Sequence, residues 1–257
     1  MSQWAWVDGV VVAVAPDLAT GVFETVGVFD GGLPLWARHL DRLEKSIVEV
    51  GGAWRAPDGL REAALTLAGR NVHDVVRVVV AAREGPATTV ITTRRREGVP
   101  EPVLLIEAPQ ARPRGERDHL KVAARPALRA ARAAAQAQGG HDAVLWRDDV
   151  ALECTAYNLF AVVGERLVTP PLEQGVLVGV ARAVLLEGLA EAGTPATVAP
   201  LPLADLRASP ALFVTNAVYG PRRARLGAGT PDPGDPWAAR LAAAWTRGLR
   251  LGPGWRR

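Results

Sequence analysis

The stretch VALECTAYNLF, residues 150–160, decides how the rest of the chain is interpreted. Two apolar β runs surround Glu153, and a buried carboxylate without a positive partner is costly. A glutamate at a strand edge, facing water, would avoid that cost and is one interpretation. The other is a carboxylate aimed at a cationic nitrogen.

The next motif, TPPLEQGVLVGVAR at residues 169–182, puts a glycine-flanked turn at the start of a predicted helix. The exposed N–H groups and the dipole of a helix start attract anions, phosphate above all. Helix starts are common, so an ordinary capped helix also explains this motif when it is taken alone.

Upstream of both motifs lies Lys121, one of two lysines among the 30 Lys and Arg residues. It follows PQARPRGERD (109–118), a polar stretch with two prolines and no periodicity, which predicts an inter-domain linker. A lysine beside such a linker can simply be solvated. Lysine amines also form imines with carbonyl cofactors, and partial burial makes the free amine available. The other lysine, Lys45, falls on the polar face of a predicted helix and is set aside.

Together, the three signals meet the requirements of pyridoxal 5'-phosphate. Its aldehyde needs an amine, and its pyridine nitrogen needs a carboxylate that keeps it protonated. Its phosphate needs N–H donors and an arginine. Each motif alone is weak, but the three in one chain predict a site for this cofactor.

Hydrophobic periodicity predicts an α+β chain with two lobes. Strands are expected at 4–14, 21–29, 75–82, 87–93, 102–107, 143–146, 150–153, 159–163, 166–169 and 211–216. Helices are expected at 36–50, 58–68, 126–138, 181–192 and 236–249, and a turn at 83–86. We therefore expect a small α/β domain at 1–108, a linker at 109–117 and a larger cofactor-binding domain at 118–257.

Composition indicates a folded globular protein. The 257 residues are 49% hydrophobic and 22% charged, which is typical of a globular domain. No apolar run approaches the roughly 20 residues that cross a bilayer, and no signal peptide is recognised, so we expect a cytoplasmic protein and no membrane partner. The single cysteine, Cys154, excludes internal disulfides and multi-cysteine metal sites. Scattered arginines without a binding motif argue against nucleic acid, and no metal is expected.

The motifs resemble those of the fold-type IV, or class IV, pyridoxal-phosphate aminotransferases over nearly the whole chain. The similar segments are GVFET (21–25), VFDG (28–31), HLDRL (39–43), E-C-T-A-Y-N-L-F (153–160), TPPL with VLVGVAR (169–182) and FVTNA (213–217). The resemblance implies a small N-terminal α/β domain, a larger C-terminal domain with a β-barrel-like core, and a homodimer.

The resemblance also implies roles for individual residues. Lys121 stands at the position of the Schiff-base lysine, which is also the general base. Glu153 stands at the position of the acid that pairs with the pyridine nitrogen, and Arg42 at that of the arginine that holds the phosphate. The other implied cofactor-binding residues are Asn158, Gly179, Val180, Ala181, Thr215 and Asn216.

Three residues depart from the family pattern. Cys154 stands where glycine usually follows the acid, and Pro126 stands where branched-chain aminotransferases have a tyrosine. Ala181 replaces a threonine whose hydroxyl donates to phosphate, a loss of about 1–3 kcal/mol in cofactor binding. Thr215 or Asn216 can compensate. A pseudoenzyme that binds the cofactor without turnover is therefore an alternative.

The compact length and the TNA signature at 215–217 resemble aminodeoxychorismate lyases. These enzymes of folate biosynthesis convert 4-amino-4-deoxychorismate to 4-aminobenzoate and pyruvate, and we expect this activity. An amino acid aminotransferase of the branched-chain or D-amino acid type is the alternative, although the arginine–histidine pair of the D-amino acid enzymes is missing after Gly85. Arg77 and Arg83 are the candidates for binding the substrate carboxylate, unless they are solvated strand arginines.

Overall fold

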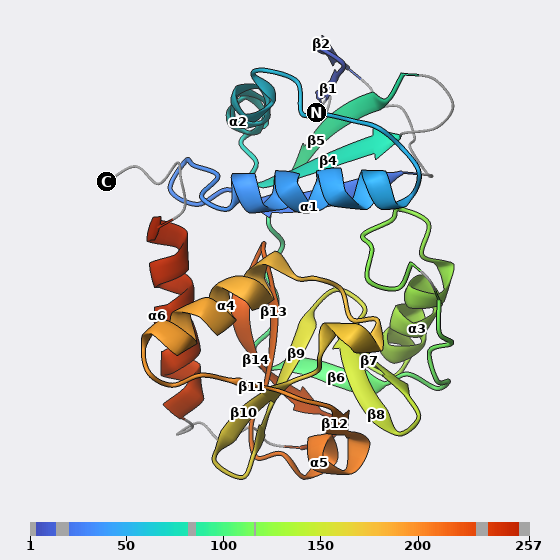
Figure 1. Ribbon diagram of the computed structural model, residues 1–257, viewed down its shortest axis with the longest axis vertical. Coiled ribbons are helices and arrows are strands. Elements are labelled where there is room, and N and C mark those ends of the chain that lie inside the picture. Colours follow the sequence, from blue (N-terminus) through green and yellow to red (C-terminus); the bar gives the residue numbers. More distant parts are fainter. Residues whose placement is uncertain (1–3, 14–20, 82–85, 116, 230–235, 252–257) are drawn as a thin grey trace. The chain divides into compact units, whose positions relative to one another are not determined.

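The computed structural model describes residues 4–13, 21–81, 86–115, 117–229 and 236–251 (Figure 1). The chain divides into two compact units. The smaller unit comprises Met1–Gly98, Leu120–Ala124 and Leu249–Arg257, and the larger unit comprises Val99–His119 and Arg125–Gly248. Each unit combines helices with a β-sheet, which confirms the predicted α+β class.

The smaller unit is built on an antiparallel sheet with the strand order β2-β1-β5-β4-β3. Its strands are β1 (Ala5–Val7), β2 (Val10–Val12), β3 (Val22–Gly27), β4 (Val75–Ala81) and β5 (Thr88–Arg94). Its helices are α1 (Trp36–Glu49) and α2 (Leu60–Asn71). The β-branched residues that fill β4 favour this extended pairing. The expected turn at 83–86 lies largely in residues 82–85, outside the described part.

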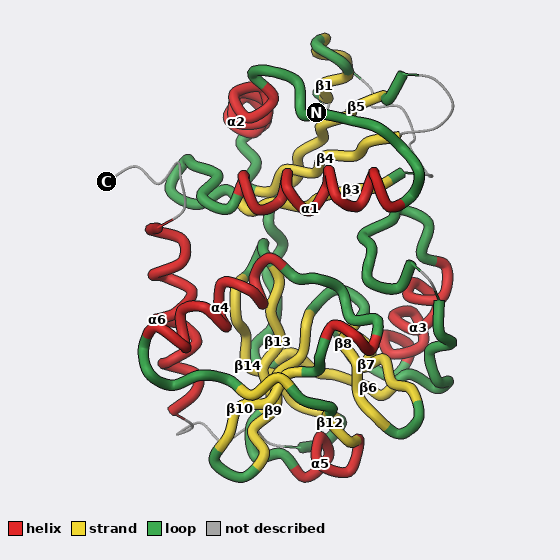
Figure 2. Tube along the Cα trace, viewed as in Figure 1, coloured by secondary structure: helices red, strands yellow, loops and turns green. Residues whose placement is uncertain are grey.

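Both helices pack on the same face of this sheet (Figure 2). Side chains alternate along a strand, so every second residue of β3 and β4 meets the helices. Val26, Val78, Leu43 of α1 and Leu67 of α2 belong to one buried cluster. Phe23 lies on the opposite face of the sheet, away from both helices.

The segment Leu120–Ala124 joins β3 from far along the chain. Phe23 N donates to Lys121 O at 3.0 Å, and Ala123 N donates to Gly21 O at 2.7 Å. An antiparallel bridge between Val22 and Val122 lies between these hydrogen bonds. Main-chain pairing thus fixes the backbone position of Lys121 within the smaller unit.

The larger unit contains a sheet with the strand order β11-β10-β9-β13-β14-β6-β7-β8-β12. Its strands are β6 (Val103–Glu107), β7 (Asp142–Arg147), β8 (Val150–Cys154), β9 (Asn158–Val163), β10 (Arg166–Thr169), β11 (Thr197–Val198), β12 (Leu201–Pro202), β13 (Leu212–Asn216) and β14 (Gly220–Leu226). Its helices are α3 (Pro126–Ala137), the short 3-10 helix η1 (Leu172–Gln174), α4 (Val180–Glu191), α5 (Leu203–Ala208) and α6 (Pro236–Leu251).

This sheet must curl, because β8 and β9 are joined by three residues although four strands lie between them in the sheet. In a flat sheet they would be about 24 Å apart, whereas three connecting residues span at most about 15 Å. The buried carboxylate of Asp142 holds the connector by accepting hydrogen bonds from the N–H groups of Thr155, at 3.2 Å, and Ala156, at 3.0 Å. The curl corresponds to the barrel-like core that was predicted.

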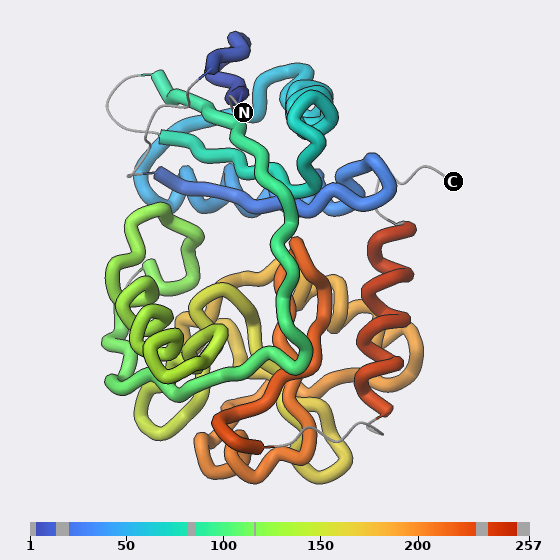
Figure 3. The backbone as a smooth tube through the Cα atoms, turned by 180° about the vertical axis from the view of Figure 1, so that it is seen from behind, coloured from blue at the N-terminus to red at the C-terminus, as the bar shows by residue number. Residues whose placement is uncertain are grey.

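Helices α4 and α6 cross in close contact, and both views of the chain show the crossing (Figures 1 and 3). Glycines allow the close approach. A Cβ at Gly188 would lie 2.9 Å from the Cβ of Ala244, and a Cβ at Gly248 would overlap Cγ1 of Val184. Larger residues at either position would force the helices apart.

The boundary between the units differs from the expected one. Strand β6 falls within the expected domain 1–108, but it pairs with β14 and β7 in the sheet of the larger unit. The expected linker 109–117 also belongs to the larger unit, and Arg112 within it is 8% exposed. Strand β14 was not predicted, because its sequence GPRRARL lacks apolar alternation. None of the described helices is both long and apolar enough to span a bilayer.

Candidate functional site

The start of α4 in the larger unit, called the cradle below, has the features of an anion-binding site. Gly179 is the N-cap and supplies no side-chain hydrogen bond to the helix. The first N–H groups, those of Val180 and Ala181, lack intrahelical acceptors by geometry, and the helix dipole adds positive potential. Asn158 of β9 donates from Nδ2 to Leu177 O at 3.1 Å, and a Cβ at Gly179 would overlap its amide oxygen. Only glycine therefore lets Asn158 support this turn.

Thr215 provides a second feature of the cradle. It pairs with Asn158 in the register of β13 and β9, and it is 1% exposed. Its Oγ1 is buried and has no hydrogen-bond partner in the described structure. An unpaired buried hydroxyl costs about 1–3 kcal/mol, so the position suits a hydroxyl that meets a ligand.

Unlike Thr215, Asn216 uses its side chain in hydrogen bonds within the protein. Its Oδ1 accepts hydrogen bonds from the N–H groups of Val218 and Tyr219, each at 3.0 Å. Its Nδ2 donates to Ala156 O at 3.3 Å. The side chain thus stabilises the turn between β13 and β14.

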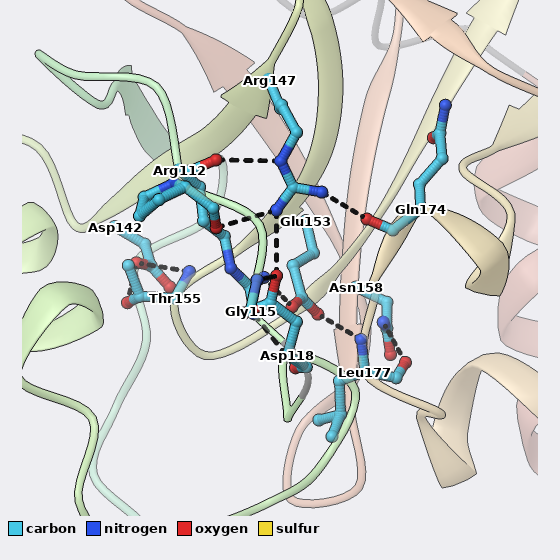
Figure 4. A network of polar contacts seen from close by, with 11 residues as sticks. Arg112, Gly115, Asp118, Asp142, Arg147, Glu153, Thr155, Asn158, Gln174 and Leu177 are labelled. Atoms are coloured by element: carbon cyan, nitrogen blue, oxygen red, sulfur yellow. Dashed lines mark hydrogen bonds and ion pairs between the residues drawn. The ribbon is translucent and has the colours of Figure 1, made fainter.

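Glu153 lies within a buried polar network (Figure 4). Its Oε1 accepts a hydrogen bond from Arg112 Nη1 at 2.8 Å, and its Oε2 accepts one from Leu177 N at 3.1 Å. Glu153 is 4% exposed, so the strand-edge interpretation does not hold. Leu177 N–H and Leu177 O connect the carboxylate of Glu153 to Asn158 and hence to the start of α4.

Arg112 is itself held in place by further contacts. Its Nη2 lies 3.0 Å from both the backbone oxygen and Oδ1 of Asp118. Arg147 donates from Nη2 to Asp118 Oδ2 at 2.9 Å and from Nε to Arg112 O at 2.9 Å (Figure 4). Arg112 and Asp118 were not predicted as site residues, because they lie in the stretch 109–118, whose composition is that of a polar linker, and no motif pointed to Arg147. The signal that could have found them was the need of a buried Glu153 for a cation.

Burial raises the pKa of Glu153, and Arg112 and the Leu177 N–H oppose this shift. Burial also raises the pKa of the neighbouring Cys154 thiol, and the charges of Asp142 and Glu153 add to the effect. Cys154 is therefore a protonated thiol that packs in the core and is not a nucleophile.

In the smaller unit, Lys121 and Arg77 both contact the ring of Phe23. Lys121 Nζ lies 4.8 Å from the ring centroid, and Arg77 Cζ lies 4.1 Å from it. Arg77 is opposite Thr25 in β3, and Arg94 is opposite Val75, two residues before Arg77. By strand alternation, Arg77, Arg94 and Phe23 share the face that the helices leave open.

Partial burial lowers the pKa of Arg77, and the charge of the nearby Arg94 lowers it further. Two guanidinium groups close to each other on one face attract an anion. Arg94 was not predicted as a site residue, because its proximity to Arg77 depends on the pairing of β4 with β5. The other candidate, Arg83, lies outside the described residues.

Arg42 of α1 contacts Glu24 of β3 in the smaller unit. Its Nε and Nη2 donate to Oε1 and Oε2 of Glu24, each at 2.6 Å. His39 Nδ1 lies 2.7 Å from Oε2 of the same carboxylate. Burial alone would raise the pKa of Glu24, but Arg42 and His39 lower it well below its usual range. Glu24 and His39 were not predicted as site residues, although both lie in the quoted motifs.

The predicted residues thus divide between the two units. The group in the larger unit consists of Glu153, Asn158, Gly179, Val180, Ala181 and Thr215. In the smaller unit, Lys121 and Arg77 meet at the ring of Phe23, whereas Arg42 contacts Glu24 on the face of the sheet that α1 covers. The larger group offers a buried carboxylate, helix-start N–H groups and an unpaired hydroxyl, which fit the nitrogen and phosphate of pyridoxal 5'-phosphate.

A family model described as amino-transferase class IV matches residues 21–226 of this chain. This match covers all the segments on which the predicted family was based. It confirms the family and the dependence on pyridoxal 5'-phosphate.

Three solved structures illustrate the shared fold. The branched-chain amino acid aminotransferase of Escherichia coli has a TM-score of 0.84 and 17% identity, covering 96% of this chain and 94% of that chain. The 4-amino-4-deoxychorismate lyase of Pseudomonas aeruginosa has a TM-score of 0.75 and 23% identity, covering 96% and 98%. A hypothetical aminotransferase of Mycobacterium tuberculosis in its PLP-bound form has a TM-score of 0.79 and 20% identity, covering 96% and 98%. The predicted fold-type IV architecture is confirmed.

Proposed function

Because this chain belongs to the class IV aminotransferase family of pyridoxal-phosphate enzymes, we propose that it is an aminodeoxychorismate lyase, which forms 4-aminobenzoate and pyruvate. The observation that carries the proposal is the shared face of Arg77, Arg94 and Phe23, with Lys121 Nζ over the same ring. The lyase substrate has two carboxylates, and two guanidinium groups near one amine suit such a molecule.

We assign the cofactor phosphate to the start of α4. The N–H groups of Val180 and Ala181 and the buried hydroxyl of Thr215 would donate to it. For Arg42, a role in holding the phosphate is what the family resemblance implies. In this assignment the Thr215 hydroxyl compensates for the hydroxyl that is missing at Ala181. Thr215 thereby gains the hydrogen-bond partner that it lacks in the described structure.

We assign the ring nitrogen of the cofactor to Glu153. The Arg112 guanidinium and the Leu177 N–H hold its carboxylate in one orientation, so little reorganisation is needed when the nitrogen becomes charged. When bound, the cofactor supplies an electron-withdrawing ring that stabilises negative charge on the adjacent substrate carbon.

Lys121 is the proposed proton carrier. Its amine would take a proton from the substrate carbon that bears the amino group, and would then give a proton to the departing pyruvate fragment. The backbone hydrogen bond from Phe23 N to Lys121 O holds the start of the Lys121 side chain at the edge of the sheet. Its Nζ lies 4.8 Å from the centroid of the Phe23 ring, a contact that helps to fix the position of the amine.

The second candidate is an amino acid aminotransferase. The same pair, Arg77 and Arg94, would accept the second carboxylate of a dicarboxylic amino donor or its oxo acid. In that reaction Lys121 would return the proton to the cofactor, and a 2-oxo acid would be required to complete the cycle.

The deciding experiment supplies 4-amino-4-deoxychorismate to the holoenzyme without any oxo acid. Continuous formation of pyruvate, measured with lactate dehydrogenase and NADH, is the expected result. No pyruvate from 4-amino-4-deoxychorismate, together with glutamate formation from 2-oxoglutarate when an amino acid donor is supplied, would show an aminotransferase and contradict the lyase. The Arg94→Gln variant should raise the KM for the dicarboxylic substrate about tenfold or more, the order expected for a charged hydrogen bond.

We also propose a homodimer in the cytoplasm, as the family resemblance implies. Sedimentation velocity of the holoenzyme tests the dimer, and a monomer at micromolar concentration would contradict it. Cell fractionation tests the location.

A further inference from the structure

Glu24, His39 and Arg42 form a buried trio within the smaller unit. Glu24 and His39 are each 1% exposed, and the Arg42 side chain is 12% exposed. Both carboxylate oxygens of Glu24 are occupied, one by Arg42 Nε and the other by Arg42 Nη2 and His39 Nδ1. His39 and Arg42 lie three residues apart in α1 and therefore face β3 together.

The chemistry of the trio assigns its protons. An ionised carboxylate only accepts hydrogen bonds, so the Nδ1 atom of His39 carries the hydrogen that points to Glu24. Burial lowers the pKa of His39, Glu24 opposes this, and the charges of Arg42 and Lys121 lower it further. His39 is thus a neutral donor, and its buried Nε2 has no hydrogen-bond partner in the described structure.

This arrangement restricts Arg42 more than an ordinary ion pair would. A bidentate contact fixes the plane of the guanidinium, but only if the carboxylate itself is fixed. His39 supplies that constraint, because it binds the oxygen that faces Arg42 Nη2. Without His39, the carboxylate can rotate and carry the guanidinium with it.

We infer that His39 is a positioning residue for phosphate recognition: it fixes Glu24, and through Glu24 it orients Arg42. The inference rests on the proposed function in one respect, the assignment of Arg42 to the cofactor phosphate. It predicts a role for His39 that depends on the phosphate group and is independent of the cofactor ring.

The test compares the affinities of the apoprotein for pyridoxal 5'-phosphate and for pyridoxal, which lacks the phosphate. Binding is followed by tryptophan fluorescence, and folding by circular dichroism. His39→Leu should weaken pyridoxal 5'-phosphate about tenfold, the order of one charged hydrogen bond, and change pyridoxal by less than about twofold. Arg42→Gln is the reference and should show the same selectivity or a larger one.

Two further variants separate positioning from folding. His39→Asn keeps a donor near the Nδ1 position and should restore wild-type selectivity for the phosphate. His39→Gln places its donor near the Nε2 position and should resemble His39→Leu. His73→Leu is the matched control, because His73 is a partly buried histidine of the same unit that bonds Thr93 at 3.0 Å. It should leave both affinities unchanged.

The outcomes distinguish the positioning role of His39 from the assignment of Arg42 to the cofactor phosphate. If Arg42→Gln discriminates between the ligands and His39→Leu weakens both equally, His39 is merely structural and the inference is overturned. If Arg42→Gln does not discriminate, the phosphate assignment of Arg42 and the inference built on it both fall. If His39→Leu does not fold, equal selectivity of His39→Asn and His39→Gln overturns the inference.

Discussion

Replacing Glu153 by glutamine tests the centre of the proposed site with little change in volume. The glutamine oxygen can replace only one carboxylate oxygen, so its NH2 group must face either Arg112 or the Leu177 N–H, both of which are donors. At least one hydrogen bond is then lost, at about 1.5–3 kcal/mol for a bond to a charged group. The buried charge, which burial disfavours, is lost as well, so we expect a net loss of stability below about 2 kcal/mol.

The effect on the reaction should be larger than the effect on folding. A preorganised charge that is removed from a buried site costs about 10²- to 10³-fold in rate. We expect Glu153→Gln to lower the single-turnover rate by that factor, measured by stopped-flow absorbance at saturating cofactor. The loss should appear in kcat, because the substrate carboxylates are assigned to other residues.

The control is Glu107→Gln, which changes a partly exposed carboxylate paired with Arg207 at 2.7 Å. It should leave the rate unchanged. If Glu153→Gln keeps a rate within about fivefold of wild type while it binds the cofactor, Glu153 does not interact with the ring nitrogen and the assignment is refuted.

Three further predictions follow from single contacts. Gly179→Ala should displace Asn158 and weaken cofactor binding at least tenfold, measured by fluorescence titration; unchanged affinity would show that the turn before α4 does not hold the phosphate. The lowered pKa of Glu24 stabilises the fold above about pH 4.5, its usual value, and this contribution is lost as the pH falls toward the lowered pKa. The difference in unfolding free energy between wild type and Glu24→Gln, from urea denaturation, should therefore be largest near pH 7 and shrink below about pH 4.5; a constant difference would contradict this. Gly248→Val should destabilise the protein by about 1–3 kcal/mol through overlap with Val184, and an unchanged midpoint of thermal unfolding would count against the close packing of α4 and α6.

Local periodicity was enough to predict most of the regular elements. The valines of β4 and the three- and four-residue spacing of buried positions in α1 each report the environment of one segment. The motif residues were also readable, since Glu153 between two apolar runs implies a partner for its charge. The family and its cofactor followed from these local patterns.

The partners of those residues depended on the tertiary structure. Arg112 lies 41 residues before Glu153 in a stretch that has the composition of a linker, and only the folded chain buries it. Strand β14 has no apolar alternation, and its place between β13 and β6 depends on hydrogen bonds that any backbone can make.

In the smaller unit, too, some features followed from the sequence and others depended on the tertiary structure. The sequence alone determined that Glu24, His39 and Arg42 lie in two neighbouring motifs, and that Lys121 is one of two possible amines. Only the pairing of β3, β4 and β5 decided that Arg94 lies near Arg77 and that Glu24 faces α1. Periodicity records which side of a strand a residue occupies, whereas contact between two residues is set by register and packing across the whole unit.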